Sequence, residues 1–378
     1  MIHNHGSAWG GNEKWLATLA AGLLRRGHRV TVACRPSGPV ADELARRGIP
    51  VVGVRPGGYL DAVRGLGFAA WLRRERPDAV LLTSRKGAAW GAWAARAAGA
   101  RVVARAGIAG TPQTWRHQLP FRRWMDGVIV NARFIADEWR RNAPWFPAER
   151  VHVVLNGTLP PRRGTSSLTR ADVCGDAGAV LVAGAGNLAH RKGFDLLLRA
   201  AARLDAPEVR PVIVGAGEAE GELRALAADL GIAERVVWMG HRGDVPDVLA
   251  ACDLFVLSSR SEGMANVMLE AMSVGTPVVA TDISGVAEAL AGRGANPPAG
   301  WIVAPDDADA LADAIRAVLD LRLTAPREIE RRVTEARRRI DEWFTVDRMV
   351  DECERILFAS DFAHEAPFAG SGAKLARR

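Results

Sequence analysis

Two glutamates eight residues apart, Glu262 and Glu270, are the strongest chemical feature of the sequence. The segment SSRSEGMANVMLEAM (258–272) follows an apolar, strand-like run and leads into a helical pattern, so Glu262 is expected in a loop and Glu270 about a turn inside a helix. The helix start between them offers free N–H groups and the positive end of a dipole, which suit a diphosphate. Gly263 lets backbone approach a ligand closely. Carboxylates accept hydrogen bonds from sugar hydroxyls, and the alternative that Glu270 only favours the first helical turn leaves Glu262 unexplained.

A second segment, AVLVAGAGNLAHRKG (179–193), carries Gly184-x-Gly186-x-x-Ala189 between a strand and a helix, which is formally a dinucleotide fingerprint. That motif requires an acidic residue at the end of the next strand to hold a ribose. The next strand-like run ends in Gly215, and Glu218 comes only in the following loop. A nicotinamide site is therefore not favoured.

Short apolar runs alternate with helical patterns along the chain, which predicts α/β structure with doubly wound parallel sheets. Because ligands bind at the carboxyl ends of strands in such sheets, two domains facing each other would form a central cleft. The predicted helices include 13–26, 193–204, 218–230 and 264–274. The predicted strands form two series, 28–34, 49–54, 78–83, 100–105, 126–131 and 150–155, then 179–184, 209–215, 235–240, 253–258, 276–282 and 300–305.

A stretch rich in Pro, Gly, Ser and Thr separates the two series. The first strand has only residues 2–4 available, so it is expected to be very short, or the true N-terminus lies upstream. We predict a first domain at 1–157, a linker at 158–174, a second domain at 175–345, a helix at 346–360 that crosses back to the first domain, and a flexible tail at 361–378.

Composition excludes several classes of protein. Hydrophobic residues make up 48% and charged residues 25%, which argues against disorder, and no apolar run approaches the ~18 residues of a membrane span. The N-terminus resembles no secretory signal, and four scattered cysteines predict neither a disulfide framework nor a cysteine zinc site, so a cytoplasmic location is expected. His3 and His5 lack a nearby third ligand, and Asp307 is expected to cap a helix with Asp309 rather than bind a metal.

Charge is distributed unevenly. Residues 1–158 hold 24 Lys and Arg against 10 Asp and Glu, whereas the rest of the chain carries a net charge of −7. A genome rich in arginine explains the 46 Arg against 4 Lys but not the asymmetry, which points to an anionic partner for the first half. Three arginines alternate with Trp115, Phe121 and Trp124 in TPQTWRHQLPFRRWMDG (111–127), which suits either an anionic membrane surface or packing against the domain, and fits nucleic acid less well.

The run from Gly184 to Pro305 resembles the nucleotide-sugar-binding half of the retaining glycosyltransferases of family 4, which have the GT-B fold of two Rossmann-like domains facing a cleft. The resemblance extends over about residues 9 to 358. Its matching pieces are WGGNEKWLATLAAGLLRRGHRVTV (9–32), VIVNARFIADEW (128–139), VLNGT (154–158), GNLAHRKG (186–193), VGAGEAEGELRALAADLGI (214–232), VVWMGHRGDVPDVLAACDLFVLSSRSEGMANVMLEAM (236–272) and GTPVVATDISGVAE (275–288).

The resemblance implies transfer of a sugar from a nucleotide-sugar donor to a cell-envelope, lipid-linked or polysaccharide acceptor, with retention of configuration and with no metal or other cofactor. By resemblance, Glu262 contacts the transferred sugar, Glu270 contacts the ribose and Lys192 contacts the diphosphate, with Arg191 as a further positive charge. The remaining donor-side residues so implied are Gly10, Gly11, Asn187, His241, Gly263, Met264, Asn266 and Val267.

This chain departs from the family pattern at two positions. Asn187 stands where a basic residue is expected after Gly186, and Arg105 stands where the family has a histidine on the acceptor side. His117 is a second acceptor-side candidate, although a histidine in a surface loop is the favoured interpretation. The departures leave open a sugar-nucleotide epimerase or phosphorylase of the same fold, or a nucleotide-sugar-binding protein without activity. The expected location is cytoplasmic, with peripheral contact to the inner face of the plasma membrane as an option.

Overall fold

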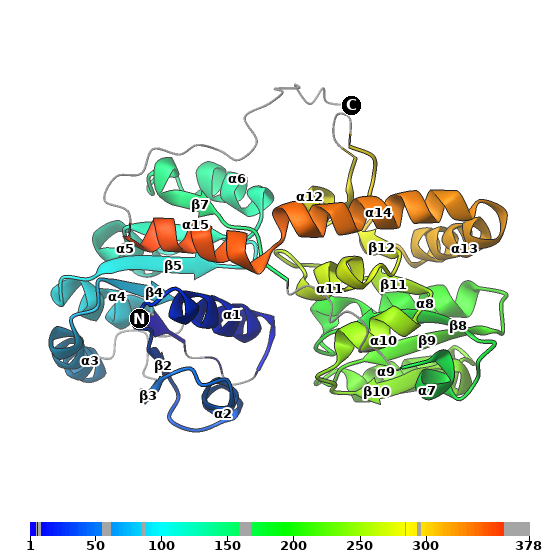
Figure 1. The fold of residues 1–378 in the computed structure, drawn as a ribbon, viewed down its shortest axis with the longest axis horizontal. Helices are drawn as coiled ribbons and strands as arrows, with labels where there is room; N and C mark the ends of the chain where they lie inside the picture. Colours follow the sequence, from blue (N-terminus) through cyan, green and yellow to red (C-terminus); the bar gives the residue numbers. More distant parts are fainter. Residues whose placement is uncertain are drawn as a thin grey trace.

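The computed structural model describes residues 1–4, 6, 9–54, 62–84, 88–158, 168–283, 285–292 and 296–358. These residues form two parallel sheets lying side by side, each with helices on both faces (Figure 1). His5, residues 159–167 of the predicted linker and the predicted tail lie outside the described residues.

The first sheet has seven strands in the order β3-β2-β1-β4-β5-β6-β7. Successive side chains of its central strands alternate between the two faces, so Val102 packs on one side and Val103 on the other. The strands are β1 (Ile2–His3), β2 (Val32–Cys34), β3 (Val51–Gly53), β4 (Ala79–Leu82), β5 (Arg101–Ala106), β6 (Gly127–Val130) and β7 (Val151–Val153).

Two groups of helices cover this sheet. One core lies beneath α1 and α15, and the other lies beneath α3, α4, α5 and α6. The helices are α1 (Gly11–Arg25), α2 (Pro39–Arg46), α3 (Ala62–Glu75), α4 (Ala88–Ala97), α5 (Trp115–Trp124), α6 (Arg133–Asn142), the 3-10 turn η1 (Ala148–Arg150) and α15 (Val346–Phe358).

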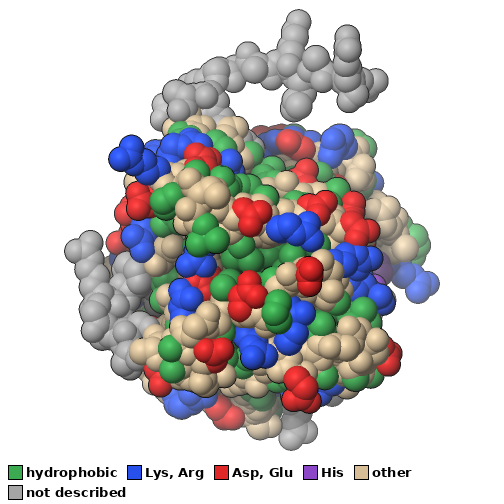
Figure 2. All heavy atoms as spheres, turned by 90° about the vertical axis from the view of Figure 1, so that its right-hand side faces the viewer, with side chains coloured by type: hydrophobic (Ala, Val, Ile, Leu, Met, Phe, Trp, Pro, Cys, Tyr) green, Lys and Arg blue, Asp and Glu red, His purple; other side chains and the backbone are tan. Residues whose placement is uncertain are grey.

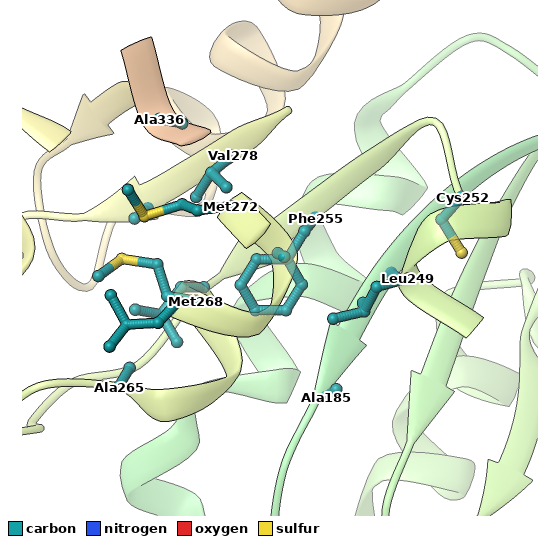
Figure 3. Packing of buried hydrophobic residues seen from close by; sticks show 14 of the residues in the cluster. Ala185, Leu249, Cys252, Phe255, Ala265, Met268, Met272, Val278 and Ala336 are labelled. Carbon is teal, nitrogen blue, oxygen red and sulfur yellow. The ribbon is translucent and has the colours of Figure 1, made fainter. Parts of the chain in front are cut away.

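The second sheet has six strands in the order β10-β9-β8-β11-β12-β13. Its core gathers Phe255 of β11 with Met268 and Met272 of α11 and Leu249 of α10, as Figure 3 shows. The strands are β8 (Val180–Ala185), β9 (Val209–Val214), β10 (Val237–Gly240), β11 (Leu254–Leu257), β12 (Val278–Thr281) and β13 (Trp301–Val303).

Helices and short turns connect these strands. Helix α7 falls within the residues predicted as a linker, and its Val173 packs into the core of the second sheet. The helices are α7 (Arg170–Cys174), α8 (Phe194–Arg203), α9 (Glu220–Asp229), α10 (Val245–Ala251), α11 (Asn266–Val274), α12 (Val286–Leu290), α13 (Ala308–Thr324) and α14 (Pro326–Trp343), with 3-10 turns η2 (His190–Lys192) and η3 (Ala233–Arg235).

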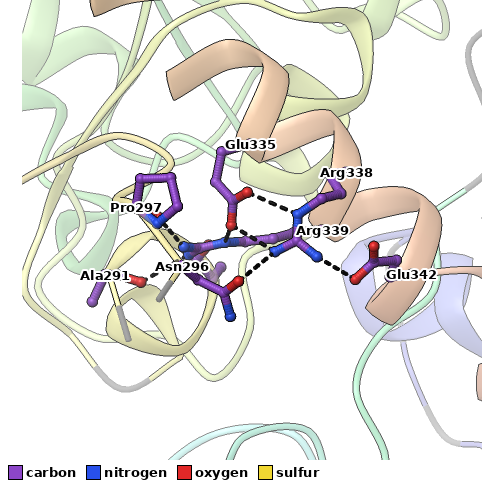
Figure 4. Close-up of polar contacts among 8 residues, drawn as sticks. Ala291, Asn296, Pro297, Glu335, Arg338, Arg339 and Glu342 are labelled. Carbon is purple, nitrogen blue, oxygen red and sulfur yellow. Dashed lines mark hydrogen bonds and ion pairs between the residues drawn. The ribbon is translucent and has the colours of Figure 1, made fainter. Parts of the chain in front are cut away.

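The chain returns to the first sheet through α14 and α15. In α14 the buried Arg339 donates hydrogen bonds to the carbonyls of Ala291 and Pro297 and to Glu335, which ties α14 to the segment after α12 (Figure 4). The backbone then crosses over at Thr158, whose N–H donates to the Phe344 carbonyl at 2.8 Å. Helix α15 packs closely on α1, where a Cβ added at Gly22 would lie 2.4 Å from Val350 Cγ2.

Each of the twelve predicted strands overlaps one of β2 to β13, and the expected short first strand is β1. The predicted fold class is thus confirmed. The loop predicted for His117 is wrong, because His117 lies in the first turn of α5, but its predicted surface position is correct, because it is exposed. At the end of the second domain that faces away from the first, positive and negative side chains are mixed with apolar ones (Figure 2).

Candidate functional site

Strands β8 and β11 are neighbours in the second sheet, and the strand order reverses between them. Loops that leave such a switch point diverge and form a crevice at the carboxyl ends of the strands. The loop after β8 carries Lys192, and the loop after β11 carries Glu262. Lys192 Nζ lies 2.5 Å from Glu262 Oε1, in a pair whose side chains are only 13% and 10% exposed. The sheet order therefore brings together the two residues proposed for the diphosphate and the sugar.

The Glu262 carboxylate has further partners at the same oxygen. Arg191 Nη1 lies 3.1 Å from Oε1, and Ser259 Oγ donates to Oε1 at 3.3 Å. Arg191 is more exposed than Lys192, with 45% of its side chain accessible. The carboxylate is therefore bordered by two cations, both of a type that binds phosphate groups.

Close backbone packing holds the Lys192 turn against the loop after β11. Gly193 has φ +63°, and a Cβ there would lie 1.9 Å from the Ser258 carbonyl oxygen, so only glycine fits. Arg260 binds Asp195 through two hydrogen bonds of 2.7 Å and donates to the His190 carbonyl at 2.9 Å. The bonds to Asp195 raise the pKa of Arg260 above its ordinary value. Sequence analysis missed Arg260 and Asp195, since no local pattern links residues 65 positions apart.

Helix α11 begins at Asn266, within the predicted helical stretch 264–274. Its N-cap, Ala265, offers no side-chain hydrogen bond, so the N–H groups of the first turn have no side-chain cap. Helix α1 of the first domain begins in the same way after Gly10. The two helix starts meet where Asn266 Nδ2 donates to the Gly11 carbonyl at 3.2 Å. Two positive helix ends at one point favour an anionic ligand there.

Glu270 lies about a turn inside α11 and faces the first domain. Its Oε1 is 4.0 Å from Lys14 Nζ of α1. Burial raises the pKa of Glu270, and the charge of Lys14 opposes this shift. A buried carboxylate whose nearest cation lies at the edge of ion-pair distance retains capacity to accept hydrogen bonds from a ligand.

Gly263 contacts the first domain. A Cβ at Gly263 would lie 2.1 Å from the Gly107 carbonyl oxygen and 2.4 Å from Asn131 Oδ1. Asn131 is 3% exposed, and its Oδ1 has no hydrogen-bond partner in the described part of the chain. The absence of a side chain at Gly263 allows the donor loop and the first domain to touch, whereas the sequence predicted a close approach of the backbone to a ligand at this position.

The other sequence candidates are placed unevenly. Met264 is buried and offers its carbonyl to Asn156, and Val267 packs against the core of the second domain. Asn187 and His241 are both exposed, on the loops after β8 and β10. His117 is exposed on α5 with its Nδ1 2.8 Å from Thr114 Oγ1.

Arg105 lies on the first-domain side of the crevice. Its guanidinium lies over the Trp15 ring, with Cζ 4.1 Å from the ring centroid. Its Nη1 donates a hydrogen bond to Asn12 Oδ1 at 2.6 Å. Arg105 also donates to Asn156 Oδ1 at 3.4 Å, so it is directed toward α1 and Asn156. Sequence analysis did not single out Asn12 or Asn156, although Asn156 lies in the VLNGT motif that it quoted.

The switch point of the first sheet, between β1 and β4, carries a second polar network. Asn4 Nδ2 donates to Thr83 Oγ1 at 2.9 Å and to Glu13 Oε1 at 3.2 Å. Asn12 Nδ2 also donates to Glu13 Oε1, at 3.0 Å. These side chains lie at the carboxyl edge of the first sheet and at the start of α1, where ligands of such sheets bind.

A separate hollow of about 600 Å³ lies on the second domain, next to the amino ends of β11 and β12. Its buried Asp253 is already paired with Arg170 and Arg322 and accepts the Leu181 N–H at 2.8 Å. Asp253 in that hollow is thus already satisfied by two arginines. The crevice at Lys192 instead combines cations, helix starts and carboxylates that fit a diphosphate and sugar hydroxyls.

No group of three His, Cys, Asp or Glu within the described residues could hold a metal ion. Asp307 accepts the N–H groups of Asp309 and Ala310, so it caps α13 as expected. Across the part of the chain that the structure describes, none of the helices has the length and apolar character of a membrane span.

Known proteins match the chain over both domains. Residues 9–158 match the family described as Glycosyltransferase Family 4, and residues 179–320 match Glycosyl transferases group 1. The lipopolysaccharide core biosynthesis glycosyltransferase LpsE of Rhizobium meliloti is 32% identical over 75% of this chain and 79% of its own length. The mannosyltransferase LpsB of the same organism is 35% identical, over 36% of this chain and 40% of its own length.

Solved structures agree on the fold. Anabaena HepE in complex with UDP-glucose superimposes with a TM-score of 0.80 at 23% identity, covering 94% of this chain and 98% of HepE. WaaG, a glycosyltransferase involved in lipopolysaccharide biosynthesis, superimposes with a TM-score of 0.69 at 18% identity, covering 95% of this chain and all of WaaG. The two matched halves, the extent of the similarity to LpsE and the shared two-sheet architecture lead to one conclusion: the chain belongs to glycosyltransferase family 4, nucleotide-sugar-dependent enzymes that are generally retaining and independent of metal ions.

Proposed function

We propose that this enzyme transfers a sugar from a nucleotide diphosphate donor to an acceptor of the cell envelope, such as a lipid-linked saccharide or a polysaccharide. The observation that carries the proposal is the Lys192–Glu262 pair at the switch point, beside the uncapped starts of α1 and α11. LpsE and LpsB, named for lipopolysaccharide core biosynthesis, support the class of acceptor. HepE was solved with UDP-glucose, so a UDP-sugar is the first donor to test.

In this proposal the positive groups act on the leaving diphosphate. Breaking the glycosidic bond adds negative charge to the diphosphate, and Lys192, Arg191 and the α11 start stabilise that charge as it develops. Lys192 must then exchange Glu262 for a phosphate oxygen. Glu262, released from Lys192, accepts a hydrogen bond from the sugar, and Glu270 accepts hydrogen bonds from the ribose.

The acceptor is proposed to bind the first domain, which carries the excess of positive charge. We propose that this domain meets an anionic membrane from the cytoplasmic side. Trp115 of α5 is 68% exposed and stands beside the exposed Arg116, whereas Phe121 and Trp124 pack into the domain. The arginine-aromatic segment thus divides into a packed part and an exposed part, and the exposed part suits a headgroup layer.

Donor identity and reaction class can be separated in two steps. A thermal-shift panel of UDP, GDP, ADP and CMP identifies the nucleotide, since a ligand at a hundred times its Kd stabilises by ~2.7 kcal/mol. The matching nucleotide sugars are then incubated with and without a lipopolysaccharide core acceptor. Transfer that requires the acceptor supports the proposal. Donor isomerised or phosphorolysed without an acceptor would instead identify an epimerase or a phosphorylase, and binding without turnover would identify a binding protein.

A further inference from the structure

Arg105 is a half-buried cation that has no carboxylate within ion-pair distance in the described part of the chain, and its Nε is fully buried. Burial lowers the pKa of its guanidinium to about 10, so it stays charged at neutral pH. Its Nε is buried without a hydrogen-bond partner there, and its two terminal nitrogens donate to Asn12 and Asn156. Holding a guanidinium here without a carboxylate partner costs free energy of folding, so we expect Arg105 to have a function that outweighs this cost.

The hydrogen bonds continue from Arg105 across the cleft. Asn156 is 2% exposed, and its Oδ1 accepts a hydrogen bond from Arg105. Its Nδ2 donates to Asn266 Oδ1 at 2.7 Å and to the Met264 carbonyl at 3.1 Å. Asn266 in turn donates to the Gly11 carbonyl at 3.2 Å. Because Gly11 precedes Asn12, these contacts form a closed ring through both domains.

The groups at the two ends fix the donor and the acceptor of each hydrogen bond in this ring. Arginine can only donate hydrogen bonds, and a backbone carbonyl can only accept them. With Arg105 at one end and the Gly11 carbonyl at the other, the Asn156 and Asn266 amides each have one orientation that satisfies every partner. Either amide, turned over or replaced by a carboxylate, would place two acceptors against each other.

The ring joins the starts of α1 and α11, the two helix ends that face the proposed diphosphate site. We propose that Arg105 and Asn156 are positioning residues for sugar transfer, which act through Asn266 to hold these two helix starts at the separation that the donor diphosphate requires. This inference rests on the proposed function. It gives Arg105, which replaces the histidine of the family pattern, a role on the donor side of the cleft.

Asn156→Asp separates positioning from simple packing. Aspartate has the same size as asparagine and adds a charge partner for Arg105, so the fold and its melting temperature should be retained. The carboxylate cannot donate to Met264 or Asn266, so the connection from Arg105 to α11 is broken. A flip of the Asn266 amide recovers one of these bonds only by losing the bond to Gly11.

The experiment measures UDP affinity by calorimetry and the kinetics of transfer for Asn156→Asp, Arg105→Ala and the double variant. We expect each single variant to bind UDP about tenfold more weakly and to lose kcat, and the double variant to be no worse than either, because both break one chain of contacts. Arg105→Lys, which keeps the charge but not the planar pair of donors, should recover little of the loss. The matched controls are Asn142→Asp at the exposed end of α6 and Arg101→Ala at the opposite end of β5, both with wild-type kinetics expected.

Wild-type UDP affinity and kcat in Asn156→Asp would overturn the inference, as would losses that add in the double variant. A wild-type protein that binds UDP but transfers no sugar defeats the proposed function alone, because the calorimetric comparison still tests the ring. A wild-type protein that binds none of UDP, GDP and ADP defeats both.

Discussion

Lys192 Nζ and Glu262 Oε1 are 2.5 Å apart, so the cation proposed for the donor diphosphate is paired with the carboxylate proposed for the transferred sugar. The pair neutralises two largely buried charges, which would each be costly alone. In the proposed function, donor binding also requires Lys192 to exchange the Glu262 carboxylate for a phosphate oxygen. The consequences for the two residues differ, because Lys192 meets a diphosphate that gains negative charge during the reaction, whereas Glu262 meets a sugar that gains positive charge.

Replacing Lys192 with alanine should weaken donor binding and lower kcat together. A hydrogen bond to a charged group contributes ~1.5 to 3 kcal/mol, which corresponds to a loss of roughly ten- to a hundredfold. The loss of kcat follows because the diphosphate gains negative charge in the transition state. Steady-state kinetics measure both effects, and Arg316→Ala, which removes an exposed partner of Asp313 on α13, is the control. Unchanged kcat with a raised donor KM would limit Lys192 to ground-state binding.

Glu262→Gln should lower kcat more than it raises the donor KM. Positive charge develops on the sugar as the glycosidic bond breaks, and a carboxylate stabilises that charge more than an amide of the same shape does. Glutamine keeps the hydrogen bond from Ser259 but loses the charge that faces Lys192 and Arg191. Full transfer activity in this variant, with the melting temperature retained, would show that the sugar site lies elsewhere.

Glu270→Gln should stabilise the protein at neutral pH while weakening donor binding. Burial raises the pKa of Glu270, so the folded state binds its proton more tightly than the unfolded state does. The contribution of Glu270 to the free energy of unfolding is therefore greatest below the pKa that it has in the unfolded state. This contribution is lost as the pH rises through the pKa that it has in the folded state. The gain in melting temperature of Glu270→Gln over wild type should thus be small near pH ~4 and larger near pH ~7. A gain that does not vary with pH would mean that Glu270 keeps its ordinary pKa.

Glu288→Ala should loosen the contact between the domains. The Glu288 carboxylate of α12 accepts the backbone N–H of Arg133 and, at 3.1 Å, that of Phe134, so a side chain of the second domain binds the positive start of α6 in the first. Small-angle scattering should report a larger radius of gyration for the variant than for wild type, with the difference reduced by saturating UDP. Identical scattering profiles with and without the substitution would exclude Glu288 as a closing contact.

Binding to anionic vesicles should depend on salt and on Trp115. Each basic residue near a phosphatidylserine surface contributes ~1 kcal/mol, and salt screens that attraction within a Debye length. Trp115→Ala and Arg116→Ala should each weaken co-sedimentation with phosphatidylserine vesicles, whereas Arg316→Ala on the second domain should not. Equal binding to phosphatidylcholine and phosphatidylserine vesicles, or binding to neither, would refute the membrane contact.

The sequence by itself predicted the elements and the donor loop. Strands such as 253–258 and the helix carrying Glu270 were predictable because burial on both faces leaves continuous apolar runs and because helix periodicity is local. Glu262 and Glu270 stood out for the same reason, since their spacing across a loop and a helix start is a property of one short segment.

Tertiary structure alone decided which of these segments meet. The Lys192–Glu262 pair follows from the position of β8 beside β11 in the sheet. A pattern within one short segment of sequence does not predict that strand order. The same holds for Arg260 with Asp195, for Glu288 at the start of α6 and for the ring through Arg105, Asn156 and Asn266. Side-chain hydrogen bonds between distant segments depend on the order and twist of two sheets and on the approach of two domains, whereas a sequence pattern records only local burial.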